Sequence, residues 1–217
     1  PQILTGTGDC NSQYDVFGNF SRAITPNGTP SPHLQWDPTE QEIFDAITDK
    51  RLDEEPMATI PEGMTARSFA AQVARERLRS AVPEVDTYCD AEINDSMYFT
   101  LFPNFHPWGA FNRINYRFRP VGTKVDECLM ECIYTEDFEG DERPAPAEYI
   151  ELGIDQEWTE LIPVIGNLAR VFHQDSFNLP KVQKGLETFR ADGLTLTKYQ
   201  EVKIRHWHAM AERFIAN

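Results

Sequence analysis

Three strand-like runs follow one another between Ser96 and Glu136, and they constrain the fold more than any other feature of the sequence. In the middle run, FNRINYRFRP, apolar side chains alternate with polar ones at the two-residue period of a β-strand. Ile114, Tyr116 and Phe118 therefore share one face, and the arginines share the other. Short connections carrying proline or glycine favour an antiparallel meander with one buried face. The three runs are SMYFTLFPNF (96–105), FNRINYRFRP (111–120) and DECLMECIYTE (126–136).

Helical patterns lie on both sides of these runs, and one further strand-like run, 13–24, precedes them. Asp37 is the expected N-cap of the first helix, with Pro38 at its first position. Residues 64–82 form the clearest amphipathic pattern, in which Phe69, Val73 and Leu78 face inward. We expect a new helix to begin at Pro180 and a final helix over 198–216. Helices gathered around an antiparallel sheet predict an α+β domain.

Composition and charge exclude several classes of protein. The 217 residues are 41% hydrophobic and can bury a sizeable core. A net charge of −15 repels phosphate, so we expect no nucleic-acid partner. No apolar run approaches the length of a membrane span, so we expect no membrane partner. We predict that Cys10, Cys89, Cys128 and Cys132 are free thiols and that the protein is cytoplasmic.

Asp175 is the most unusual residue of the second half of the chain. Leu161, Ile165, Leu168 and Phe172 follow the spacing of one helix face, and Asp175 is the next position on it. A carboxylate on an apolar face is costly unless it is paired, protonated or bound to a metal. Three interpretations are open: the helix ends near Asp175 and the carboxylate is not buried, it pairs with a distant arginine, or it is a metal ligand.

The sequence offers Asp175 no obvious partner of its own. His173 is two residues from Asp175, so the two side chains point to different helix faces. His206 and His208 are also two residues apart and cannot share one helix face. His33 and His106 are expected in turn or loop regions. The sequence contains no HExxH pair, no GxSxG elbow and no phosphate-binding glycine motif. A complete metal site is therefore not predicted from these residues.

Two phrases in the sequence resemble one known family. Residues 97–139, MYFTLFPNFHPWGAFNRINYRFRPVGTKVDECLMECIYTEDFE, resemble the central sheet of the catalytic domain in the large subunit of Rieske-type aromatic-ring-hydroxylating oxygenases. HQDSFNLPKVQKGL is similar to the closing helices of that family, in which an Asp before a VQxGL phrase ligates mononuclear iron. Asp175 matches that Asp. The resemblance covers most of the chain, and it implies that 1–217 is one catalytic domain that is incomplete at its N-terminus.

The resemblance implies a fold, a chemistry and partners. The fold is the START-like helix-grip domain, a curved antiparallel sheet wrapped around a long C-terminal helix. The chemistry is hydroxylation of an aromatic or other apolar substrate by O2 at mononuclear Fe(II). A reductase or ferredoxin supplies electrons through a Rieske [2Fe-2S] cluster, and the complete protein is expected to be a homo-oligomer, trimer-like.

The resemblance also implies which part of such an enzyme this sequence represents. The two histidine ligands of the family belong to a HxxxxH motif, and the opening PQIL resembles the residues just after the second of these histidines. We therefore expect the histidines and the Rieske domain to lie ahead of Pro1, either cut away, on a separate chain or not included. On this expectation the chain alone holds no cofactor and is inactive.

The resemblance assigns roles to six residues. Asp175 is the expected iron ligand, and the other five are expected to contact substrate. Three precede Asp175 on its helix, and two lie where the first strand of the meander ends. For each apolar residue, ordinary core packing is the alternative. For the whole chain, the alternatives are a helix-grip protein that binds an apolar ligand without catalysis and an assembly subunit. The five residues are Leu168, Val171, Phe172, Phe102 and Asn104.

Overall fold

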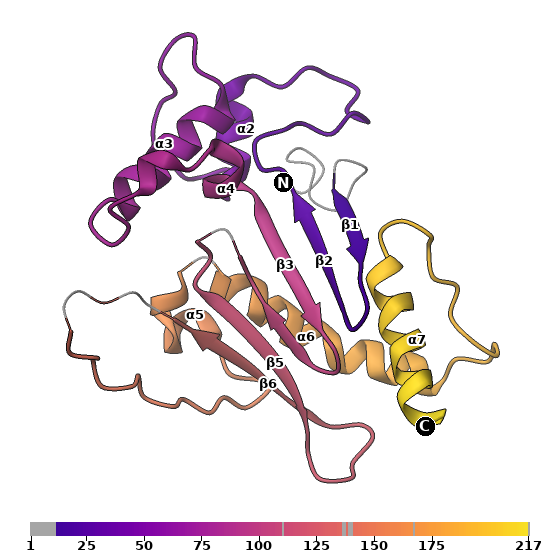
Figure 1. Cartoon of the computed structure of the whole chain (residues 1–217). Helices are drawn as coiled ribbons and strands as arrows, with labels where there is room; N and C mark the ends of the chain where they lie inside the picture. Colours follow the sequence, from indigo (N-terminus) through magenta and orange to yellow (C-terminus); the bar gives the residue numbers. More distant parts are fainter. Residues whose placement is uncertain (1–11, 110, 136–137, 139–140, 167, 217) are drawn as a thin grey trace. The chain divides into compact units, whose positions relative to one another are not determined.

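The computed structural model describes residues 12–216 except 110, 136–137, 139–140 and 167 (Figure 1). The chain forms two compact units. The first, here called the sheet unit, comprises Pro1–Val121, Cys128–Asp137 and Leu196–Asn217. The second, the helical unit, comprises Gly122–Glu127 and Phe138–Thr195.

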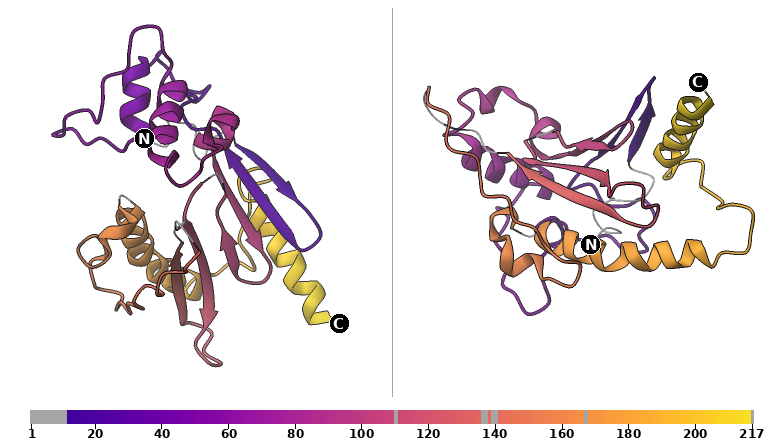
Figure 2. Two further views of the ribbon diagram at one scale, coloured as in Figure 1. Left: turned by 60° about the vertical axis from the view of Figure 1, so that its left-hand side comes forward. Right: turned by 90° about the horizontal axis from the view of Figure 1, so that it is seen from below.

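The sheet unit contains one antiparallel sheet of six strands in the order β1-β2-β3-β4-β5-β6 (Figure 1 and Figure 2). Each strand pairs with the next strand along the chain, so the predicted meander and the α+β class are confirmed. The strands are β1 Gln13–Val16, β2 Phe20–Thr25, β3 Ser96–Leu101, β4 Phe105–Pro107, β5 Ile114–Pro120 and β6 Cys128–Tyr134.

Two of the expected strands are each divided in two. The run 13–24 is a hairpin, closed by a hydrogen bond of 2.8 Å from the Phe17 amide to the Phe20 carbonyl. The run 96–105 ends as β3 at Leu101, and the chain re-enters the sheet as β4. Pro103 lies between them and has no N–H with which to continue a strand ladder. The sheet therefore has more strands than the sequence pattern predicts.

The segment between β2 and β3 folds into helices α2 (Glu40–Ile47), α3 (Ala66–Leu78) and α4 (Asp90–Asn94), with a short 3-10 turn η1 (Val85–Thr87). The N-cap of α2 is Thr39, so the expectation of Asp37 at the cap is wrong by two residues. Thr39 is the N-cap because it forms a capping box with Glu42. The Thr39 amide donates to Glu42 Oε2 at 2.7 Å, and the Glu42 amide donates to Thr39 Oγ1 at 3.2 Å.

Helix α3 packs its inner face against both of its helical neighbours. Ile43 and Phe44 of α2 form one cluster with Ala66, against which Phe69 packs. A second cluster joins α3 to η1 and α4, and Leu78 packs against it. The inward orientation predicted for Phe69 and Leu78 is therefore confirmed. The buried members of the second cluster are Ala71, Val85 and Ile93.

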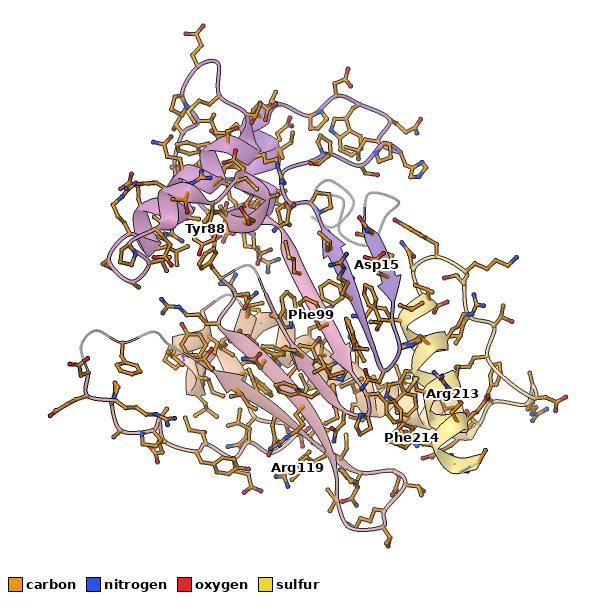
Figure 3. The ribbon with its side chains drawn as sticks, viewed as in Figure 1. Asp15, Tyr88, Phe99, Arg119, Arg213 and Phe214 are labelled. Carbon is orange, nitrogen blue, oxygen red and sulfur yellow. The ribbon has the colours of Figure 1, made fainter. Side chains whose placement is uncertain are left out.

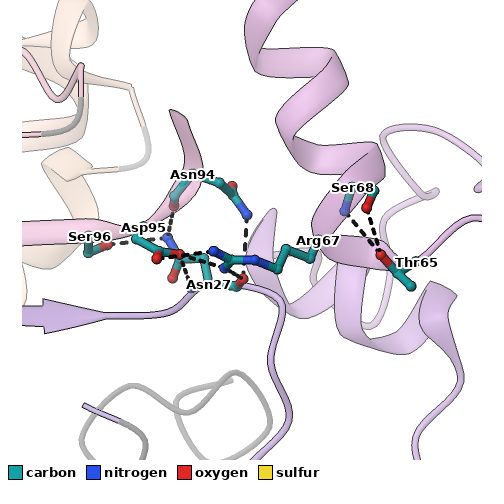
Figure 4. A network of polar contacts seen from close by, with 7 residues as sticks. All are labelled: Asn27, Thr65, Arg67, Ser68, Asn94, Asp95 and Ser96. Atoms are coloured by element: carbon teal, nitrogen blue, oxygen red, sulfur yellow. Dashed lines mark hydrogen bonds and ion pairs between the residues drawn. The ribbon is translucent and has the colours of Figure 1, made fainter. Parts of the chain in front are cut away.

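A polar network closes the base of this helical segment (Figure 4). Arg67 of α3 donates to Asp95 at 2.5 and 3.1 Å and to the Asn27 carbonyl at 2.7 Å. The Asn27 side chain in turn donates to the Asn94 carbonyl at 2.6 Å. Asn27 follows β2 and Asp95 immediately precedes β3, so Arg67 holds together the two ends of the helical segment. Asp95 is 8% exposed, and hydrogen bonding to it raises the pKa of Arg67.

The C-terminal helix α7 (Val202–Ala216) lies beside β1 (Figure 1). Before the helix begins, the ring of Tyr199 meets that of Tyr14 edge-on at 5.2 Å. Farther along, the Trp207 indole donates to the Pro103 carbonyl at 2.6 Å, and Phe214 contacts Phe102 at 4.9 Å between ring centroids. These contacts connect the last helix to the turn that follows β3.

The helical unit contains α5 (Trp158–Leu161), a 3-10 turn η2 (Pro163–Ile165) and α6 (Leu168–Glu187). The expected single helix through Leu161, Ile165 and Leu168 is wrong, because Gly166 at a φ of 57° leaves the right-handed helical region. The expected new helix at Pro180 is also wrong, since α6 continues through it. A proline removes one hydrogen bond of a helix, and here the turns on either side of it remain intact.

In the part of the chain that the structure describes, no helix has both the length and the apolar character needed to cross a membrane.

Replacement of Arg67 with methionine should lower the free energy of unfolding by about 3 kcal/mol or more, because it leaves the buried Asp95 carboxylate without its counter-charge. Arg79→Met is a matched control, since Arg79 of the same segment pairs with Asp86 at the surface. That exposed pair should contribute little to stability, because solvent screens its charges. Urea denaturation of both variants measures the difference, and equal losses would contradict the role assigned to Arg67.

Candidate functional site

Asp175 lies on the face of α6 that is exposed. Val171, Leu179 and Val182 are exposed on the same face, at the spacing of successive helical turns. Asp175 is therefore a single carboxylate within an exposed aliphatic stripe. Its carboxylate forms no hydrogen bond or ion pair with any other described residue. Partial burial raises the pKa of the Asp175 carboxyl.

This placement decides between some of the interpretations of Asp175. The helix does not end near it, because α6 continues to Glu187. No arginine or lysine among the described residues pairs with it. The carboxylate is exposed, as the first interpretation expects, but for a different reason: it belongs to an uncovered face in the middle of a helix. The role of Asp175 as a metal ligand stays a prediction.

The three residues predicted to line a cavity before Asp175 lie in different environments. Leu168 is the first residue of α6 and is half-buried. Val171 is exposed, and it lies one turn before Asp175. Phe172 is 5% exposed and packs against the Trp158 ring at 5.6 Å. The structure thus brings Val171 to the face of Asp175 and places Phe172 in the core of the helical unit.

His173 is engaged away from Asp175. Its Nε2 atom lies 3.1 Å from Glu157 Oε2, which agrees with the expectation that the two residues occupy different helix faces. Hydrogen bonding from Thr159 is the main cause that lowers the pKa of Glu157, and the charge of His173 adds to it. Within the described ranges, no three His, Cys, Asp or Glu side chains are grouped so as to hold a metal ion.

Phe102 lines an apolar groove of the sheet unit with a volume of about 410 Å³. Phe99, which projects from β3, is part of the same groove (Figure 3). Asn104 does not line this groove; its backbone carbonyl accepts the Phe118 amide at 3.1 Å. The groove is large enough for a small ligand and has mostly apolar walls. Its lining residues are Asn19, Phe20, Phe99, Leu101, Phe102 and Pro107.

The other face of the sheet carries aromatic rings and several polar groups, and we call it the aromatic face. Residues that lie directly opposite each other on paired strands point to the same face of a sheet. On this face the opposed pairs are Ser21 and Thr100, Ala23 and Tyr98, and His106 and Tyr116. Tyr98 is also bridged to Trp108, with ring centroids 5.3 Å apart. The aromatic face comprises Ser21, Tyr98, Thr100, His106, Trp108, Tyr116 and Phe118.

His106 belongs to this face, so its expected place in a loop is wrong. Its ring stacks on Tyr116 at 5.1 Å and meets Phe118 edge-on at 5.5 Å. Its Nδ1 atom lies 3.3 Å from the Thr100 hydroxyl. Burial, together with the charge of Lys203, lowers the pKa of His106 to about 4, so the ring is neutral at neutral pH. The alternation Phe105, His106, Pro107, Trp108 is the sequence signal for this strand.

Lys203 reaches the aromatic face from α7. Its Nζ atom lies 4.3 Å from the centroid of the Tyr98 ring and 3.4 Å from the Tyr98 carbonyl oxygen. Burial lowers the pKa of Lys203 to about 8 and raises the pKa of Tyr98 to about 12. Sequence reasoning missed Lys203, because in the sequence it reads as one more charged residue of an amphipathic helix.

The groove face of the sheet also carries ion pairs, at its far strands. Glu131 of β6 accepts from Arg117 at 2.6 Å and from Arg119 at 2.7 Å. Hydrogen bonds from Arg119 and then Arg117 lower the pKa of the Glu131 carboxyl. The predicted alternation of apolar and basic residues along β5 is therefore confirmed.

The cysteines behave as the sequence predicts where the structure describes them. Cys89, Cys128 and Cys132 are free thiols, and Cys10 lies outside the described residues. Burial raises the pKa of Cys132 to about 11, which keeps it protonated and poorly nucleophilic at neutral pH. Cys132 is thus not a candidate nucleophile.

Comparison of the chain with protein families, with characterised proteins and with solved structures found no match.

Replacement of His106 with phenylalanine should flatten the loss of stability on acidification. Because the pKa of His106 is about 4 in the folded protein and 6.5 in the reference state, the unfolded chain binds more protons between these values. Stability from His106 is therefore present above pH 6.5 and is lost as the pH falls toward 4. The loss should be on the order of 2 kcal/mol, because solvent screening around the half-buried ring reduces the effect of the full pKa shift. Unfolding free energies measured from pH 7 to 4 test this, and an unchanged slope contradicts it. His208→Phe, at an exposed position of α7, is the control.

Proposed function

We propose that this chain contributes the catalytic domain of a Rieske-type non-haem iron oxygenase, which hydroxylates an aromatic or other apolar substrate with O2. Asp175 is the carboxylate ligand of its mononuclear Fe(II). Two histidines from outside this sequence complete the triad, and a Rieske [2Fe-2S] cluster on a domain outside it delivers electrons from a reductase or ferredoxin. The complete protein is a homo-oligomer.

The position of Asp175 on α6 is the observation that supports the proposal most. The family phrase from Asp175 to Leu186 lies on one uninterrupted helix. Asp175 and Val182, seven residues apart, lie two turns apart on one face, so the carboxylate and the aliphatic part of the phrase point the same way. An exposed aliphatic stripe with one unpaired carboxylate suits a face that other polypeptide covers when a site is assembled.

Asp175 suits one position of an iron site but does not form a site alone. Two neutral imidazoles and one carboxylate suit Fe(II), and they leave coordination positions open. Partial burial raises the pKa of the Asp175 carboxyl, and a bound cation would favour its charged form. The centre supplies the oxidative chemistry when it is bound, and the chain's own residues orient the substrate and exclude water.

The architecture is compatible with the START-like helix-grip fold that the proposal requires. The sheet unit supplies a continuous antiparallel meander, and α7 follows as the last helix and contacts its first strands. The apolar groove at Phe102 offers a surface for an apolar substrate. These features support the proposed class of fold and ligand.

The purified 217-residue chain should bind no Fe(II) tightly, because a single carboxylate is a weak site for a first-row metal. Iron analysis after anaerobic loading and desalting measures the stoichiometry. One tightly held iron per chain would contradict the proposed division of ligands between this chain and other polypeptide.

In the oxygenase assembled with its histidine-bearing polypeptide, Asp175→Asn should reduce mononuclear iron to a small fraction of the wild-type content and abolish hydroxylation. The visible absorption of the Rieske cluster should persist, because that cluster has its own ligands. Glu187→Gln is the matched control on the same helix, and it should retain iron and activity. Full iron content in Asp175→Asn would contradict the role of Asp175 as the iron ligand.

A further inference from the structure

The aromatic face contains hydrogen-bonding groups that have no partner in the described chain. The Trp108 Nε1 atom and the Ser21 hydroxyl are both buried, and neither has a hydrogen-bond partner among the described residues. Trp108 can only donate, so its indole requires an acceptor. Leaving such groups unsatisfied in the interior costs about 1–3 kcal/mol each. Unpaired donors on one face of a sheet therefore indicate a missing acceptor.

The same face contains a positive charge without a counter-charge. The Lys203 ammonium is half-buried, and its contacts are the Tyr98 ring and the Tyr98 carbonyl. No carboxylate of the described residues lies within ion-pair distance of it, although the chain carries 35 acidic residues. A partly desolvated cation is costly unless it is paired. The net charge of −15 repels anions from the protein as a whole. Only a local positive group such as Lys203 can therefore attract an anionic ligand.

The surroundings of these donors are flat rings. Tyr98 and Trp108 lie 5.3 Å apart between centroids, and Tyr116 lies 6.4 Å from Trp108. Aromatic rings of this kind contact planar ligands by stacking or edge-on. His106 contacts Thr100 and Tyr116, and burial keeps its ring neutral at neutral pH, so it adds no second positive charge. The face thus combines one cation, a free indole donor and aromatic walls.

We propose that the aromatic face of the sheet binds a planar aromatic ligand that carries an anionic oxygen group, a carboxylate or phenolate, and that Lys203 pairs with this group while Trp108 donates to it. Stacking against Tyr98 and Tyr116 holds the ring of the ligand. Lys203 is thus a specificity-determining residue, which distinguishes charged from neutral aromatic compounds. The site lies entirely within the sheet unit and requires neither iron nor Asp175, so it goes beyond the proposed oxygenase function.

Titration of the chain with benzoate and with the neutral isostere benzamide tests the proposal. Isothermal calorimetry gives the affinity, and the indole N–H resonance of Trp108, assigned with Trp108→Phe, reports contact with the acceptor. Benzoate should bind at least about tenfold more tightly than benzamide and should shift that resonance, because charge-assisted hydrogen bonds are roughly twice as strong as neutral ones.

Variants at Lys203 separate a binding role from a structural one. Lys203→Met should weaken benzoate about tenfold or more and leave benzamide unchanged, whereas Lys203→Arg should retain benzoate. Lys198→Met, at an exposed position of the same unit, should behave as wild type. Circular dichroism melting curves check that each variant is folded. Equal binding of the two probes, undiminished benzoate binding in Lys203→Met, or no benzoate binding at millimolar concentration would overturn the proposal.

Discussion

The ion pair between Arg67 and Asp95 is the interaction on which the architecture of the sheet unit depends. Strands β2 and β3 are neighbours in the sheet, yet the whole helical segment α2 to α4 separates them in the chain. Loop closure of this length costs conformational entropy, and long-range contacts must offset it. Arg67 provides such long-range contacts where the helical segment meets the sheet, because it bonds to both Asn27 and Asp95. The network holds the register that aligns Ala23 with Tyr98.

That register has consequences for the two faces of the sheet. On one face it gathers Ser21, Tyr98, Thr100 and their neighbours into the aromatic face. On the other it places Phe20 beside Leu101, where the apolar groove lies. A slip of one residue would exchange these two sets of side chains, since a strand alternates faces with every residue. The chemistry available to the unit is therefore a product of strand pairing.

The sequence predicted the kinds of elements well where the pattern was long and regular. The meander, the α3 helix and the final helix are all found, because side-chain periodicity and buried faces enforce one another. It failed at boundaries that depend on single residues. Thr39 replaces Asp37 as a cap through its bond with Glu42, and α6 continues through Pro180. Such competitions are decided by local contacts that a periodicity count does not contain.

The sequence by itself determined that an antiparallel sheet would carry helices and that Asp175 would stand out as a carboxylate among apolar residues. Both follow from the order of residue types along a single element. Only the tertiary structure decided which distant residues meet. Lys203 lies on the last helix and Tyr98 on the third strand, and nothing in their spacing predicts a contact of 4.3 Å. Burial at such a contact changes the pKa of each group, and burial is a property of the folded chain rather than of the residue.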